Sequence, residues 1–246
     1  MRASSNIISS NVSSDLSFSA GAIVRPLTVR RMASARRMRL AVDPRDGAVR
    51  LTLPQRASEA KARLWVEGQR AWVEHQLGRL PAPHPIEPGG TIPFRGETLP
   101  IDWTLTYPRT PHLDDGRLIV GGPSEGVARR VLTWLRREAL RVLDAETDVM
   151  AARAGVEVGR VSIGDPRTRW GSCSQSGDIR YAWRLILAPP FVLTATVAHE
   201  VAHRLHMDHG RGFHAAEARL LEADPAPARA WLRAYGAALY WVGCGS

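Results

Sequence analysis

Apolar and polar residues alternate along the first half of the chain in the pattern of short β-strands. Residues 37–42 and 49–53 both alternate, and the Asp, Pro and Gly residues between them favour a turn, so a hairpin is predicted there. Apolar residues at helical spacing then predict one helix from Ser58 to about Leu80. Further short strands are expected at 91–94, 99–107 and 117–120.

Helical periodicity dominates the second half. It predicts a long amphipathic helix over 125–154, and after it a strand over 156–163 and a strand pair within 168–183. Pro189 and Pro190 open a helix that should run to about His206. Two more helices are expected at 213–222 and 227–241. Strands come first and helices follow, with a strand pair set among them, which indicates an α+β fold.

The same pattern divides the chain into three regions. Residues 1–23 are rich in Ser and Asn and lack the compact apolar segment of a secretory signal, so we expect a disordered N-terminal tail. Residues 24–122 should form a β-rich N-terminal subdomain with one helix. Residues 123–246 should form the domain that carries the chemistry.

Arginine supplies nearly all of the net charge of +9, since Lys61 is the only lysine. One explanation is a polyanion partner, such as nucleic acid or a nucleotide. The other is an arginine-rich coding bias spread over solvated surfaces. We favour the bias, because the densest stretch of arginines, Arg30 to Arg39, contains no aromatic residue.

The remaining composition is that of a globular chain, with 44% hydrophobic and 23% charged residues. No segment approaches the roughly 18 apolar residues that span a bilayer, so we expect no membrane partner, and we expect a monomer. Cys173 and Cys244 are too few for a disulfide framework, which favours a reducing compartment and predicts a cytoplasmic location.

The clearest chemical signal is a His-Glu-x-x-His pattern at 199–203, on the predicted apolar helix. His199 and His203 are four residues apart, so both imidazoles lie on one helix face and can reach one metal ion. Glu200 lies about 100° around the helix, where a carboxylate can act as general base towards a water molecule. A metal also gives these polar groups a partner inside an apolar helix.

A catalytic zinc usually takes three protein ligands. His206 lies about 10.5 Å along a continuous helix from His199, too far to share one ion. His209 is the preferred third ligand, because Asp208 and Gly210 favour a turn that brings it back towards the ion. The carboxylates of Glu217 and Glu222 remain alternatives. Asp208 and His206 are candidates for orienting the ligands.

Three segments then resemble a known family. They are Arg-Trp-Gly-Ser-Cys-Ser at 169–174, Trp-Arg-Leu-Ile-Leu-Ala-Pro-Pro at 183–190, and the histidine motif that continues to Phe213. Together they resemble the YgjP-like metallopeptidase family of the zincins, which is related to the SprT-like and WLM proteins. The resemblance implies a minimal zincin-like core, with His199, His203 and His209 as ligands and Glu200 as catalytic base. The family often has Trp where His214 stands.

The resulting prediction is a zinc-dependent hydrolase with one catalytic Zn2+. It would be a metallopeptidase that cleaves peptide or protein substrates with metal-bound water and Glu200 as general base. One alternative uses the same site as a nucleotide phosphohydrolase of the nucleoside triphosphate pyrophosphatase type, because arginine suits phosphate. A lesser alternative is a non-enzymatic, zinc-stabilised nucleic-acid-binding protein, in which Glu200 has no role.

Peptide hydrolysis also needs a group that stabilises the developing oxyanion. The candidates for this role, or for other substrate contacts, are Arg169, Trp170, Tyr181 and His214. The sequence does not choose among them.

Overall fold

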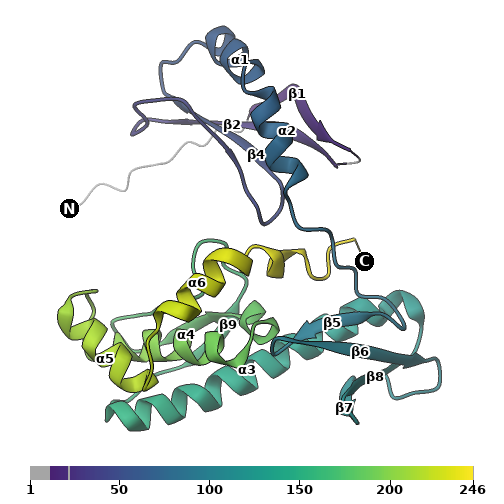
Figure 1. Ribbon diagram of the computed structural model, residues 1–246, viewed down its shortest axis with the longest axis vertical. Coiled ribbons are helices and arrows are strands. Elements are labelled where there is room, and N and C mark those ends of the chain that lie inside the picture. The colour runs from purple at the N-terminus through teal and green to yellow at the C-terminus, as the bar shows by residue number, and fades with distance from the viewer. Residues whose placement is uncertain (1–11, 22, 246) are drawn as a thin grey trace. The chain divides into compact units, whose positions relative to one another are not determined.

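The computed structural model of the protein describes residues 12–21 and 23–245. The chain forms two compact units that divide between Ala82 and Pro83 (Figure 1). This division precedes the boundary predicted at residue 122. The reason is that the strands of 91–121 share a core with the helical half, where Leu118 and Val120 join Trp134 in one buried cluster.

The first unit is built on a four-stranded sheet with strand order β1-β2-β4-β3. The strands are β1 (Val12–Ala20), β2 (Ile23–Met32), β3 (Arg39–Val42) and β4 (Val49–Pro54). Strands β3 and β4 pair antiparallel, which confirms the predicted hairpin, whereas β2 and β4 pair parallel.

Strand β1 lies within the segment for which a disordered tail is predicted, and that prediction is wrong for residues 12–20. Leu16 and Phe18 alternate with serines and are both buried, so this strand contributes to the core of the unit. Residues 1–11 lie outside the described residues.

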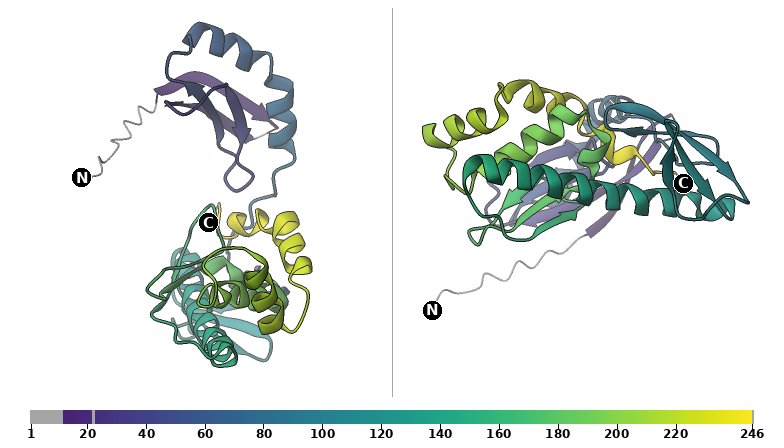
Figure 2. Two further views of the ribbon diagram at one scale, coloured as in Figure 1. Left: turned by 90° about the vertical axis from the view of Figure 1, so that its left-hand side faces the viewer. Right: turned by 90° about the horizontal axis from the view of Figure 1, so that it is seen from below.

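The helix predicted over 58–80 is two helices, α1 (Glu59–Glu67) and α2 (Arg70–Gly78). Gly68 follows the first helix, where its backbone N–H caps carbonyls of the last turn, and glycine is a poor residue for continuing a helix. Val66, Val73 and Leu77 are fully buried in the cluster that they share with the sheet. Both helices therefore cover one face of the sheet (Figure 2).

The second unit opens with another four-stranded sheet, of order β5-β6-β8-β7. Its strands are β5 (Thr91–Phe94), β6 (Glu97–Thr104), β7 (His112–Asp114) and β8 (Arg117–Gly121). Arg95 and Gly96 both have positive φ and form the two-residue turn between β5 and β6. Their N–H groups donate to the carbonyls of Ile186 and Leu187, at 2.8 and 3.3 Å. Strand β7 is fully exposed, so it lacks the alternation that would predict it.

The long predicted helix is α3 (Val127–Ala154), which ends at Gly155 in the left-handed conformation. A three-stranded sheet of order β10-β11-β9 follows. It consists of β9 (Val161–Gly164), β10 (Gly171–Cys173) and β11 (Ile179–Ala182). Strand β10 pairs only with β11 among the described strands, so it lies at the edge of this sheet.

The most apolar helix, α4 (Pro190–Ala202), contacts α3, α5 (Arg211–Leu221), α6 (Ala226–Tyr235) and strand β10. It ends at Ala202, earlier than predicted, because the N–H groups of Arg204 and Leu205 donate to the carbonyls three residues back, those of Val201 and Ala202, which departs from the α-helical pattern. None of the described helices combines the length and apolar character needed to cross a membrane. The architecture is α+β, as predicted, and α4 lies at the centre of the second unit (Figure 1).

Candidate metal centre

Three histidines meet at the C-terminal end of α4. His199 and His203 come from successive turns of that end, and His209 comes from the loop before α5. One nitrogen from each ring lies within 4.8 Å of the others, and the Nε2 atoms of His199 and His209 are 3.3 Å apart. The loop thus brings the preferred third histidine to the helical pair, in an arrangement that would suit one ion.

In two of these rings, the nitrogen that points away from the cluster lies beside a hydrogen-bond acceptor. The Nδ1 atom of His199 lies 2.9 Å from Glu217 Oε1, and the Nδ1 atom of His203 lies 3.2 Å from the His206 carbonyl oxygen. A carboxylate and a carbonyl can only accept, so each Nδ1 donates the proton and each Nε2 presents a lone pair. This is the orientation that metal-binding histidines need, and the residues therefore fit a zinc-type ion.

The position of the third histidine is set by the turn of its loop and by a neighbouring ring. Asp208 Oδ1 accepts a hydrogen bond from the Gly210 N–H at 2.9 Å, which makes the tight turn around His209. Phe213, fully buried on α5, packs against all three imidazoles with ring centroids 4.6 to 4.9 Å away. The phenyl ring therefore forms a rigid apolar wall behind the cluster.

The two carboxylates considered as rival ligands lie elsewhere. Glu217 bonds the back of His199 rather than joining the cluster of three nitrogens. Glu222 is exposed beyond the end of α5 and lies 3.7 Å from Arg153. Of the two residues expected to orient ligands, His206 does so through its carbonyl, and Asp208 acts by shaping the turn.

Glu217 is itself held by Arg229, a residue on α6 to which the sequence analysis assigned no role. Burial raises the pKa of Glu217, but hydrogen bonds from His199 and Arg229 outweigh it and lower that pKa to about 2. Glu217 is therefore ionised at neutral pH. The series Arg229, Glu217, His199 links helix α6 to the histidine cluster through one ion pair, between Arg229 and Glu217, and one hydrogen bond, from His199 to Glu217.

Glu200 is buried, with 4% of its surface exposed. Burial raises its pKa to about 7, against the opposing effects of His199, Arg169 and a backbone hydrogen bond from Cys173. A carboxylate whose pKa lies near neutrality can both take up and release a proton, which is the property of a general base.

The position of Glu200 depends on strand β10. The Cys173 backbone hydrogen-bonds its carboxylate. A Cβ atom on Gly171 would lie 2.6 Å from Cγ and Cδ of Glu200, closer than carbon atoms can approach. The glycine that the resemblance places in this segment therefore has a local reason: it leaves room for the carboxylate.

Of the four candidates for substrate contacts, two line a pocket beside Glu200 and two do not. The Tyr181 hydroxyl is buried and hydrogen-bonds Thr147 at 3.0 Å, and burial raises the pKa of this tyrosine. The Tyr181 side chain is thus directed into the core, and it does not line the pocket. His214 lies 3.5 Å from Glu217 and is exposed, outside the pocket lining. Arg169 and Trp170 do line the pocket beside Glu200.

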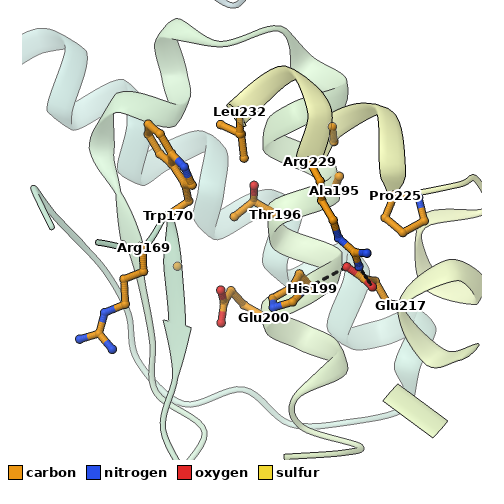
Figure 3. A pocket seen from close by; sticks show the side chains of 12 residues that line it. Arg169, Trp170, Ala195, Thr196, His199, Glu200, Glu217, Pro225, Arg229 and Leu232 are labelled. Carbon is orange, nitrogen blue, oxygen red and sulfur yellow. Dashed lines mark hydrogen bonds and ion pairs between the residues drawn. The ribbon is translucent and has the colours of Figure 1, made fainter. Parts of the chain in front are cut away.

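That pocket has a volume of about 290 Å³ and adjoins His199 and Glu200 (Figure 3). Its walls come from the start of β10 and the residues just before it, from α4 and from α6. Most of the lining surface is apolar, and the apolar residues are Trp170, Gly171, Ala195, Pro225, Ala228 and Leu232. The Thr196 hydroxyl donates to the Val192 carbonyl at 2.8 Å, so it brings no unpaired donor into this space.

The Trp170 wall of the pocket is braced from behind. Its ring lies 5.7 Å from that of Tyr240, whose hydroxyl donates to the Pro166 carbonyl at 2.6 Å. A Cβ on Gly236 would come within 2.7 Å of the indole, so this glycine lets the tryptophan pack against α6. The pocket is therefore largely preformed.

The fold and the centre define a class: an α+β protein with three histidines and a buried glutamate gathered around one helix end, suited to a single metal ion. A comparison with protein families agrees. The model of the YgjP-like metallopeptidase domain matches residues 36–235, and the chain belongs to this family. Searches of curated proteins and of solved structures each find no match.

Proposed function

We propose that this protein is a zinc-dependent peptidase whose ion is held by His199, His203 and His209. The observation that carries the proposal is the convergence of three imidazole nitrogens next to a pocket that also contains the Glu200 carboxylate. Family membership supports the reaction class, and three histidine ligands leave a coordination position open, as catalytic zinc sites do.

Zinc at this place would polarise the scissile carbonyl and lower the pKa of a coordinated water molecule. The chain's own residues do the rest. Glu200 accepts a proton at its carboxylate and returns it to the leaving amine. Glu217 and the His206 carbonyl keep the two helical imidazoles in the tautomer that binds metal. Arg169 is the remaining cationic candidate for stabilising negative charge near Glu200.

The shape of the pocket supports a peptide as substrate. A volume of about 290 Å³ is at the small end for sites that enclose a whole ligand, and it suits one side chain. The walls are mostly apolar, and Arg229 is neutralised by Glu217. We therefore propose that the pocket takes an apolar side chain next to the cleaved bond.

The decisive experiment compares the purified protein with its Glu200→Gln variant. We expect both to bind one zinc per chain, because Glu200 is not a ligand, and only the first to cleave peptides from a mixed library. If Glu200→Gln turned over peptide as fast as the parent, Glu200 would not be the general base. His203→Ala is the complementary variant, and stoichiometric zinc in it would contradict the ligand set.

Nucleoside triphosphates belong in the same assay as the contrasting substrate class. Hydrolysis of triphosphates without any peptide cleavage would show that the site acts on phosphates and not on peptides.

The described cysteines, Cys173 and Cys244, are both free thiols, which supports the reducing, cytoplasmic environment that we propose for this activity.

A further inference from the structure

The net charge of the protein is concentrated in one of its two units. Residues 1–82 contain 14 basic and 6 acidic residues, so they carry a net +8 of the total +9. Residues 83–246 contain 19 basic and 18 acidic residues and are almost neutral. An arginine-rich coding bias acts on the whole chain, so it does not explain why acidic residues balance arginine in one unit only.

Four arginines of the first unit form a group at the end of β2, in the following turn and at the start of β3: Arg30, Arg36, Arg37 and Arg39. We call them the arginine cluster. All four are exposed, and no ion pair involves any of them within the described chain. They are therefore cations without a compensating carboxylate.

The sheet register places two members of the cluster on the same face. Arg30 of β2 pairs with Thr52 of β4, and Thr52 pairs with Arg39 of β3, so the three side chains point to one side. The two arginines are two strand spacings apart, about 10 Å. The opposite face is the one whose leucines and valines are buried against α1 and α2. Strands β2, β3 and β4 contain no acidic residue.

The surroundings of the cluster indicate which polyanion fits. Stable anchoring on a membrane needs apolar side chains that insert beside the cations, but the exposed large apolar residues of this unit, among those described, are Val24, Leu64 and Trp72, outside residues 30–39. A single strand would need aromatic rings on which bases stack, and residues 30–39 contain none. Phosphate groups at regular spacing on a duplex require only cations.

We propose that the arginine cluster binds the phosphate backbone of double-stranded nucleic acid without reading its sequence. This surface is formed entirely by the first unit, so the inference stands independently of the proposed peptidase reaction.

The test measures binding of the full-length protein to a duplex of about 20 base pairs by fluorescence anisotropy, as a function of salt. The variant is Arg30→Gln combined with Arg39→Gln. Its matched control is Arg137→Gln combined with Arg219→Gln, two exposed arginines of the other unit, which gives the same total charge. Arg50 is left unchanged, because it pairs with Asp43 and Asp46 within the fold.

For the parent protein we expect affinity that falls steeply with salt. Each lost phosphate contact makes the negative slope of log K against log salt shallower by about 1. The slope of the cluster variant should therefore be shallower than that of the parent by about 2, and the slope of the control should be unchanged. Glu200→Gln should bind the duplex as the parent does. An equal effect of the two double variants, or tighter binding to phosphatidylserine vesicles than to duplex, would overturn the proposal. Absence of salt-dependent duplex binding would also overturn it.

Discussion

Replacing Gly171 by alanine tests how the carboxylate of Glu200, the proposed general base, is placed. Gly171 is not among the residues with positive φ, so alanine meets no backbone penalty there. The added methyl group would instead lie 2.6 Å from two side-chain carbons of Glu200. Carbon atoms pack at about 3.5–4.0 Å, so the carboxylate has to move by about 1 Å.

A displacement of that size is large for a reacting group. A misplacement of about 1 Å lowers catalytic rates by about 100-fold, which corresponds to about 2.7 kcal/mol of transition-state stabilisation. The three atoms nearest to the new methyl group all belong to Glu200, which is not a proposed ligand, so zinc binding should be unchanged. Gly171 also lines the pocket, so the methyl group is expected to change KM as well, and kcat is the quantity that reports on the carboxylate.

The assay measures kcat and KM on a peptide that the parent protein cleaves, together with zinc content and the melting temperature. Gly78→Ala is the matched control, since a Cβ on this glycine at the end of α2 meets nothing within 4 Å. Full kcat in zinc-loaded Gly171→Ala would show that Glu200 does not depend on this close approach. Loss of zinc would show that the substitution acts on the ligands instead.

Three further predictions concern the support of the fold and the ion. His209→Ala should leave the melting temperature of the metal-free protein almost unchanged but reduce zinc to well below one ion per chain by elemental analysis, because two imidazoles remain. Glu217→Gln should weaken zinc affinity by about 10- to 100-fold in a chelator competition, since the Nδ1 of His199 loses its charged acceptor; unchanged affinity would refute this orienting role. In the first unit, burial raises the pKa of Asp43, but bonds from Arg50 and Arg45 lower it from 3.8 to about 2. Its ionised form therefore contributes about 1–2 kcal/mol of stability above pH 4, and the difference in unfolding free energy between the parent and Asp43→Asn should shrink as the pH falls towards 2.

The sequence predicted the parts of the centre that one helix and one loop determine. The spacing of His199 and His203 fixes a shared face, and Asp208 with Gly210 favours the turn that returns His209. The contribution of Arg229 was missed because it depends on how α6 packs against α5, which local pattern does not encode. The sequence also did not predict that the Tyr181 hydroxyl bonds Thr147 in the core, because the position of Tyr181 in β11 does not reveal this partner.

Elements were predicted best where burial gives a clear period. The strands of the β3–β4 hairpin alternate and formed as expected. The serines of β1 obscured the alternation of Leu16 and Phe18. The polar composition of residues 1–23 was therefore interpreted as disorder. The end of α4 was predicted too late because the chain after it makes backbone hydrogen bonds to carbonyls three residues back, at Val201 and Ala202, which the side-chain pattern does not reveal.

The three proposed ligands are not equally well supported by the fold. His199 and His203 belong to a helix end packed among α3, α5, α6 and β10, whereas His209 is exposed on a short connection. Opening that connection would release one ligand and leave the rest of the fold intact. We therefore expect the lifetime of the bound ion to be governed by local loop motion, so that a chelator strips zinc much faster than the protein unfolds, and added zinc restores the centre without refolding.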